Sequence, residues 1–238
     1  MMEIRFHPTP ATLEKDELHG ATVVVIDVLR ATSTIIAAIE QGASNVIPVE
    51  SIEAASRLAG AGDRGGKLLA GEQKGMPVEG FDLFNSPVEI ERTDVAGKTI
   101  VLATSNGSPA IVAASRAESV LICAIRNVDA TIAALGDCER LTILCGGDAG
   151  KICSEDLLCG GMILEGLGPQ IDRDRLTDPA SLALLITRSV EGSIARFLRG
   201  TDRGRRLSEI GFQGDIEWCA RRGGSTIVPR FRQGSITP

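Results

Sequence analysis

Residues 23–34 read Val-Val-Val-Ile-Asp-Val-Leu-Arg-Ala-Thr-Ser-Thr, and this stretch decides the fold. The β-branched run at its start predicts a buried strand, because strands covered on both faces are apolar throughout. Residues 31–41 then follow the pattern of a helix that ends at Gly42. A buried strand that leads through a short polar turn into a helix is typical of a βαβ unit. It predicts an α/β fold with a largely parallel sheet.

The same alternation continues along the chain. Further strands are predicted at residues 45–49, 67–70, 99–103, 119–124 and 141–145, and helices at residues 52–61, 109–116, 129–135, 156–167 and 179–198. Residues 71–91 are irregular and are interrupted by glycine and proline. A loop of this length inside a compact domain is usually functional.

Residues 24–49 and 99–124 share one pattern of strand, polar turn, helix and strand. Because any two βαβ units look alike, a true internal repeat and a coincidence remain equally open. In either case both polar turns lie at the carboxyl end of a strand, where open α/β sheets bind ligands. We therefore expect the turns at Asp27 and Asn106 to converge on one cleft.

The composition narrows the classes of function. The chain has 238 residues, 43% of them apolar, and a formal net charge of -6. The lack of a long basic stretch argues against nucleic acid as a partner, and no apolar run approaches the roughly 20 residues of a membrane span. Residues 1–10 lack the apolar core of a signal peptide. The six cysteines include no Cys-x-x-Cys pair, which favours a reduced cytoplasmic protein over a disulfide framework.

The turn after the first strand combines groups that can handle a phosphate. Asp27 could bind a hard metal ion, and the guanidinium of Arg30 could hold a phosphate through two parallel N–H bonds. Backbone N–H groups at the start of the helix would add to anion binding. The alternative is structural: Thr32 or Ser33 caps the helix, and Asp27 pairs with Arg30. The sequence leaves both interpretations open.

Residues 104–109, Thr-Ser-Asn-Gly-Ser-Pro, form a second turn between a strand and a helix. Ser108 as the N-cap and Pro109 as the first helical residue would explain the segment as structure. Alternatively, the tight turn at Asn106 and Gly107 could expose backbone N–H groups to a phosphate.

Two charged segments lie later in the chain. Glu155 and Asp156 precede an apolar helix, where acidic residues usually offset the helix dipole; beside the glycine turn at residues 146–148 they could instead bind a metal ion. The basic cluster of Arg203, Arg205 and Arg206 is expected to form a solvated loop surface.

Common phosphoryl-transfer motifs are missing. Residues 146–151 resemble a phosphate loop, but the glycine spacing is too short, and Ile152 stands where Ser or Thr should hold magnesium. No cysteine is followed by an arginine six residues later, and Asp27 lacks the second aspartate of the haloacid-dehalogenase pattern. The only histidines, His7 and His19, show no catalytic motif. Acid–base chemistry would therefore fall to carboxylates, a cysteine or metal-bound water.

Taken together, several segments resemble the 2-phosphosulfolactate phosphatase family. They run in order over nearly the whole chain, at residues 25–32, 71–72, 80–89, 104–107, 154–161 and 207–220. The most specific strings are Asp-Val-Leu-Arg-Ala-Thr at residues 27–32 and Asn-Ser-Pro-Val-Glu at residues 85–89. Some positions depart from the family pattern: Gln73 stands where an arginine is common, and Arg203 stands where a histidine is frequent. Because both positions are expected to face an anion, these departures bear on which acid groups the substrate carries. They bear less on the assignment to a phosphatase.

The resemblance implies Mg²⁺-dependent hydrolysis of 2-phospho-3-sulfolactate to 3-sulfolactate and phosphate, a step towards coenzyme M. It also implies a three-layer α/β/α arrangement with a mixed, largely parallel sheet, which we expect to form one domain over residues 1–238. The family's shared polar positions fall on Asp27, Arg30, Glu72, Asn85, Glu89, Asn106, Glu155 and Asp156.

From these positions we expect three groups of site residues. Asp27, Arg30 and Glu72 are expected to be catalytic. Arg30, Asn85, Ser86, Asn106 and Gly107 are expected to bind the small anionic phosphorylated substrate. Asp27, Glu155 and Asp156 are expected to hold Mg²⁺. A covalent route through Asp27 or a cysteine stays open, as does a homodimer.

Two other classes of function compete with this interpretation. The first is a non-catalytic anion-binding paralogue, but a binder of anions gains nothing from extra carboxylates without a metal. The second is a nucleotide-binding transferase, which the missing phosphate loops disfavour.

Overall fold

The computed structural model describes residues 1–60, 64–136, 138–190 and 192–238. The strands are β1 (Glu3–His7), β2 (Thr22–Ile26), β3 (Asn45–Val49), β4 (Lys67–Gly71), β5 (Leu83–Phe84), β6 (Thr99–Ala103), β7 (Ser119–Cys123), β8 (Arg140–Cys145), β9 (Arg230–Arg232) and β10 (Ser235–Thr237). The α-helices are α1 (Ala31–Glu40), α2 (Ile52–Ala59), α3 (Pro87–Glu91), α4 (Gly107–Ala113), α5 (Val128–Leu135), α6 (Ser154–Leu167), α7 (Asp178–Ser189), α8 (Ile194–Gly200), α9 (Asp202–Glu209) and α10 (Gln213–Cys219).

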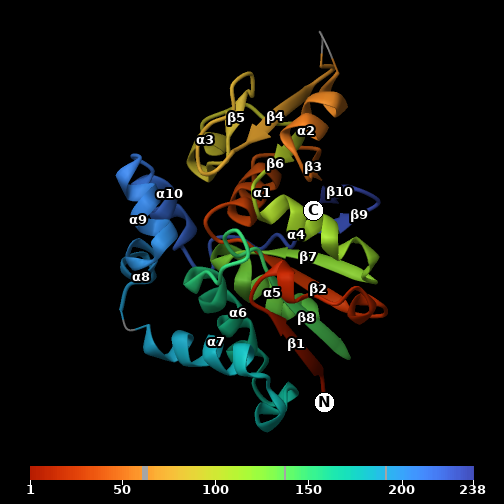
Figure 1. Cartoon of the computed structure of the whole chain (residues 1–238), viewed down its shortest axis with the longest axis vertical. Coiled ribbons are helices and arrows are strands. Elements are labelled where there is room, and N and C mark those ends of the chain that lie inside the picture. The colour runs from red at the N-terminus through yellow and green to blue at the C-terminus, as the bar shows by residue number, and fades with distance from the viewer. Residues whose placement is uncertain (61–63, 137, 191) are drawn as a thin grey trace.

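The strands of the described residues form one mixed sheet in the order β1-β8-β2-β7-β9-β10-β3-β6-β4-β5. Helices α5, α6 and α7 pack on the group that contains β1, β2, β7 and β8, and α2 packs on β3, β4 and β6. Helices α8, α9 and α10 stack along one side (Figure 1). The fold is therefore the three-layer α/β/α arrangement with a largely parallel sheet that the resemblance implies.

Two parallel groups of strands build this sheet. Strands β1, β8, β2 and β7 pair in parallel, as do β3, β6, β4 and β5. The C-terminal hairpin of β9 and β10 pairs antiparallel with β7 on one side and with β3 on the other. The last residues of the chain thus join the two groups.

The two segments with a shared pattern cross between these groups. The segment β2-α1-β3 starts in the first group and ends in the second, and β6-α4-β7 runs the opposite way. Their helices start side by side: a Cβ added at Gly107 would lie 2.3 Å from the Cβ of Ala31. The structure confirms that the turns at Asp27 and Asn106 converge.

Both helix starts differ from the capping that the sequence suggested. The N-cap residues are Arg30 and Asn106, and neither side chain makes a capping hydrogen bond. Ser108 lies inside α4 and donates to the carbonyl of Leu102 at 3.0 Å, while Thr32 lies inside α1 and donates to the carbonyl of Asp27 at 2.9 Å. The predicted N-caps at Ser108 and at Thr32 or Ser33 were therefore wrong. These hydroxyls instead bind the turns back to the preceding strands.

Other differences concern short elements. The irregular stretch of residues 71–91 contains β5 and α3, and the predicted helix at residues 179–198 is two helices, α7 and α8. Helix α2 ends at Ala59, and residue 61 of the predicted helix lies outside the described residues.

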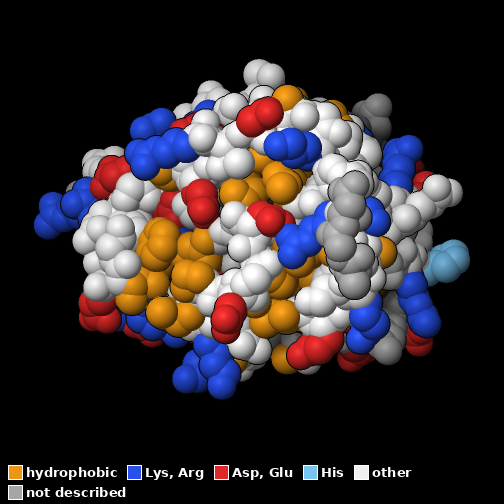
Figure 2. All heavy atoms as spheres, turned by 90° about the horizontal axis from the view of Figure 1, so that it is seen from above, with side chains coloured by type: hydrophobic (Ala, Val, Ile, Leu, Met, Phe, Trp, Pro, Cys, Tyr) orange, Lys and Arg blue, Asp and Glu red, His pale blue; other side chains and the backbone are white. Residues whose placement is uncertain are grey.

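The surface of the described residues mixes apolar and charged groups. Seen from above, apolar side chains gather on part of the face, with acidic and basic side chains interspersed around them (Figure 2). No helix of the described ranges has both the length and the apolar character needed to cross a membrane.

Candidate active site

Asp27 stands at the carboxyl end of β2, level with the ends of β7 and β8. Two glycines leave room for its carboxylate. A Cβ added at Gly107 would lie 2.6 Å from Asp27 Oδ2, and one added at Gly146 would lie 3.1 Å from the same oxygen. The carboxylate is therefore enclosed by backbone on two sides, and it is 4% exposed.

Three buried carboxylates influence one another at this point. Burial raises the pKa of Asp27 to about 6, the charge of Arg203 opposes this shift, and the charge of Glu72 adds to it. Burial and the charge of Asp27 also raise the pKa of Glu155. The pKa of Asp156 is raised well above its ordinary value by burial and by the charges of Asp27 and Glu155. Such a cluster is stabilised in its ionised form only by nearby positive charge.

Asp156 ties two loops together. Its Oδ1 accepts a hydrogen bond from Val28 N at 2.9 Å, and its Oδ2 accepts one from Gly147 N at 3.2 Å. Both oxygens thus bind the turn after β2 to the glycine loop after β8. Of the three predicted metal ligands, Asp27 is the most exposed at 4%, and Glu155 and Asp156 are each 2% exposed.

Arg30 does not pair with Asp27, so the alternative of an Asp27–Arg30 ion pair was wrong. Its guanidinium is paired with Asp215 of α10 and is 2% exposed at the side chain. Its Cζ lies 4.4 Å from the centroid of the Phe84 ring and 4.6 Å from that of Phe212. Because the two centroids are only 4.8 Å apart, both rings approach the guanidinium from neighbouring directions. Asp215 lies 185 positions from Arg30 in the sequence, so no local sequence pattern could predict this ion pair.

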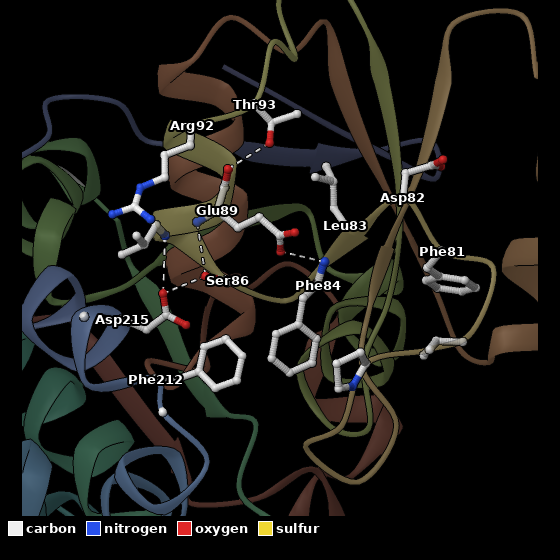
Figure 3. Close-up of a pocket in the computed structure, with 15 residues that line it drawn as sticks. Phe81, Asp82, Leu83, Phe84, Ser86, Glu89, Arg92, Thr93, Phe212 and Asp215 are labelled. Carbon is white, nitrogen blue, oxygen red and sulfur yellow. Dashed lines mark hydrogen bonds between the residues drawn. The ribbon is translucent and has the colours of Figure 1, made fainter.

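Asp215 also anchors α3. It accepts hydrogen bonds from Ser86 Oγ at 2.7 Å and from Val88 N at 3.3 Å (Figure 3). Ser86 in turn caps α3 by accepting from Glu89 N at 3.2 Å. Ser86, predicted to bind substrate, is therefore engaged in holding α3 and Asp215 together. A cavity of about 650 Å³ lies on this side of Asp215 and is lined mainly by apolar groups, but neither Asp27 nor Arg30 lines it.

Glu72 joins the loops after β4 and β6. Its Oε1 accepts from Ser105 N at 2.6 Å, and its Oε2 accepts from Ser105 Oγ at 3.2 Å. Gly75 N donates to the same Oε2 at 2.5 Å. The carboxylate is 5% exposed, so these bonds orient it rigidly.

Two buried amide atoms have no hydrogen-bond partner among the described residues: Asn85 Oδ1 and Asn106 Nδ2. The other end of the Asn106 amide accepts from Ala149 N at 3.0 Å, which fixes its orientation. A buried polar atom without a partner is unfavourable by about 1–3 kcal/mol. These atoms are therefore candidates for contact with a ligand, as the sequence predicted for both residues.

A small cavity brings several of these residues together. Its volume is about 150 Å³, below the roughly 300–1,000 Å³ of pockets that bind drug-sized ligands. It is lined by apolar groups and by seven polar side chains, which are Arg30, Glu72, Lys74, Asn85, Arg203, Arg206 and Glu209. Its size and the excess of basic over acidic side chains suit a small anion.

Arg203 is the site residue that sequence reasoning missed. It lies on α9, with its side chain only 14% exposed, and Nε donates to the carbonyl of Leu29 at 3.2 Å. Burial lowers the pKa of its guanidinium, but the charges of Asp27, Asp148 and Glu72 more than offset this and raise it. The expectation of a solvated loop was wrong for this arginine. Two sequence signals could have found it: its place in the basic cluster, one helical turn from Arg206, and its position where the family frequently has a histidine.

Magnesium fits the donors around Asp27 in type and charge. The described residues contain no group of three or more His, Cys, Asp or Glu side chains placed to hold a metal ion. Mg²⁺, however, is usually bound by one or two carboxylates together with waters and substrate phosphate. Among the described residues, Arg30 forms an ion pair with Asp215, and Arg203 forms one with Asp148. No ion pair of the described residues includes Asp27. A buried carboxylate without a paired cation suits such an ion.

Comparison with known proteins identifies the family that this chain resembles. A family model described as 2-phosphosulpholactate phosphatase matches residues 7–234. The chain is 34% identical over 236 residues to a probable 2-phosphosulfolactate phosphatase of Caldanaerobacter subterraneus subsp. tengcongensis, covering 99% of this chain and 98% of that relative. It is 36% identical over 213 residues to the one of Thermotoga petrophila, covering 90% of each chain. It is 36% identical over 222 residues to the one of Symbiobacterium thermophilum, covering 93% of this chain and 95% of that relative.

Proposed function

The chain belongs to the 2-phosphosulfolactate phosphatase family, and from this we propose that it hydrolyses 2-phospho-3-sulfolactate to 3-sulfolactate and phosphate with Mg²⁺. The observation that carries the proposal is the small basic cavity, in which Arg30, Glu72 and Asn85 meet Arg203. A compact substrate with several negative charges matches both the volume and the lining. The six free cysteines are compatible with a reduced cytoplasmic setting, which we include in the proposal.

The side chains of the site would share the work of phosphoryl transfer. Arginine N–H groups would offset the charge of the phosphoryl oxygens. Magnesium, held by Asp27 and Glu155, would supply charge stabilisation at the phosphoryl oxygens and lower the pKa of bound water. Without a cation, burial raises the pKa of Asp27 to about 6, and a bound cation would favour its ionised form. Glu72 would keep the Ser105 loop in place beside the substrate.

A phosphate-release assay tests the proposal. Purified protein is incubated with 2-phospho-3-sulfolactate, 2-phospholactate and phosphoserine, each with Mg²⁺ and after exhaustive chelation. We expect the first substrate to have the highest kcat/KM and chelation to abolish turnover. Equal rates with and without Mg²⁺ would exclude the metal.

The competing function is anion binding without catalysis. It would be recognised by tight binding of the substrate and no phosphate release at any Mg²⁺ concentration. The cluster of Asp27, Glu155 and Asp156 speaks against it, because these carboxylates would repel an anion unless a cation lay between them.

A further inference from the structure

Two arginines line the small cavity, and different parts of the fold hold them. Arg30 is held by Asp215 of α10 and by two rings. One ring is that of Phe84 in β5, and the other is that of Phe212, the residue before α10. The two rings lie within cation–π distance of the guanidinium, and together with the ion pair to Asp215 they restrict its orientation. The N–H groups that Asp215 does not use remain for a ligand.

Arg203 is held on the side of the Asp27 turn. Its Nε donates to the carbonyl of Leu29 at 3.2 Å, and its Nη1 donates to Asp148 Oδ1 at 3.4 Å. Asp148 lies in the loop after β8, where the next residue bonds to Asn106. Arg203 is therefore attached to the loops that surround Asp27, whereas the side chain of Arg30 is attached to β5 and α10.

The charges agree with this placement. The charge of Arg203 acts on both Asp27 and Glu155. The backbone agrees, because Asp148, the ion-pair partner of Arg203, follows Gly146 by two residues, and a Cβ added at Gly146 would lie 3.1 Å from Asp27 Oδ2. The phosphoryl group must lie near these carboxylates if they hold the metal ion, so Arg203 is the arginine on the phosphoryl side.

We propose that the two arginines divide the substrate: Arg203 binds the phosphoryl group, and Arg30 binds the sulfonate. The division deepens the proposed function and rests on it. In 2-phospho-3-sulfolactate only the ester oxygen and two carbons separate phosphorus from sulfur, so one small cavity can hold both groups. The N–H groups of Arg30 that Asp215 leaves free can present two parallel donors to an oxyanion, which a lysine cannot.

Binding of the two products separately tests this division. Inorganic phosphate and 3-sulfolactate are titrated by calorimetry into the wild type, Arg203→Lys, Arg30→Lys and Arg205→Lys, all with Mg²⁺. We expect Arg203→Lys to weaken phosphate about tenfold or more and to leave 3-sulfolactate within about twofold. Arg30→Lys should show the reverse. Arg205 is an exposed residue of the same helix, paired with Asp202, and its variant should change neither affinity.

A second variant keeps the test decisive if Arg30→Lys does not fold. Phe212→Leu removes one ring from the guanidinium and leaves the ion pair with Asp215, so it should weaken 3-sulfolactate alone. The division is overturned if Arg203 and Arg30 variants weaken the same ligand, if the pattern is reversed, or if the wild type binds neither ligand at millimolar concentration.

Turnover separates this inference from the proposed function. In Arg30→Lys, kcat/KM for 2-phospho-3-sulfolactate should fall towards that for 2-phospholactate, which lacks the sulfonate, while kcat/KM for 2-phospholactate should hardly change. A wild type that binds both products in the expected pattern but releases no phosphate refutes hydrolysis and keeps the division. Normal turnover with the reversed binding pattern refutes the division alone.

Discussion

Replacing Gly107 with alanine should damage both the fold and the site. The added Cβ would lie 2.3 Å from the Cβ of Ala31 and 2.6 Å from Asp27 Oδ2. Carbon atoms in contact are separated by about 3.5–4.0 Å, so one of the two turns must move by about 1.2 Å or more. Both neighbours are buried and belong to the crossing between the two strand groups, so they have little room to yield.

The size of the effect follows from this overlap. Overpacking a buried contact usually costs about 1–3 kcal/mol, and we expect Gly107→Ala at the upper end of that range. A displacement of about 1 Å at a catalytic group can lower the rate about 100-fold. We therefore expect a loss of about 3 kcal/mol in the free energy of unfolding and a fall of about 100-fold in kcat/KM.

Urea denaturation and phosphate release measure the two effects. Gly200→Ala is the matched control, because no atom lies within 4 Å of its added Cβ; it should leave stability and turnover nearly unchanged. If Gly107→Ala lost less than about 1 kcal/mol and kept wild-type turnover, the contact between the turns would not hold Asp27 in place, and the reasoning would fail.

Three further predictions concern buried charge. Asp27→Asn should remain folded and lose phosphate release; turnover near the wild-type rate would remove Asp27 from the mechanism. Burial raises the pKa of Asp27 to about 6, so the metal-free folded protein keeps a proton that the unfolded chain releases near 3.8. The free energy of unfolding should therefore fall as the pH rises from about 4 to about 6, by up to about 3 kcal/mol, and this part should vanish in Asp27→Asn; equal urea-denaturation slopes for both proteins in EDTA would contradict it. Asp215→Asn leaves Arg30 as an unpaired buried cation and should cost about 3–5 kcal/mol, whereas Asp202→Asn at an exposed pair should cost less than about 1 kcal/mol; similar thermal stability of the two variants would argue against the Arg30 clamp.

The sequence predicted the central elements well where burial is local and continuous. The strands at residues 45–49 and 99–103 have the predicted bounds, and the strand before Asp27 starts at Thr22. A β-branched run between turn residues reports its own burial, so it needs no knowledge of its neighbours. Strands β1, β9 and β10 were missed. Strands β9 and β10 have three residues each, which carry too little pattern to be recognised alone, and the five residues of β1 pair with the distant β8.

For the site, the sequence by itself determined which polar groups follow the central strands. Asp27, Glu72 and Asn106 lie where parallel strands end, and that position follows from the local alternation of strand and helix. Only the tertiary structure decided their partners: Arg30 pairs with Asp215 rather than Asp27, and Arg203 enters the cavity from a late helix. The reason is physical. Hydrophobic periodicity records which face of an element is buried, whereas an ion pair depends on distances that only the packing of distant elements sets.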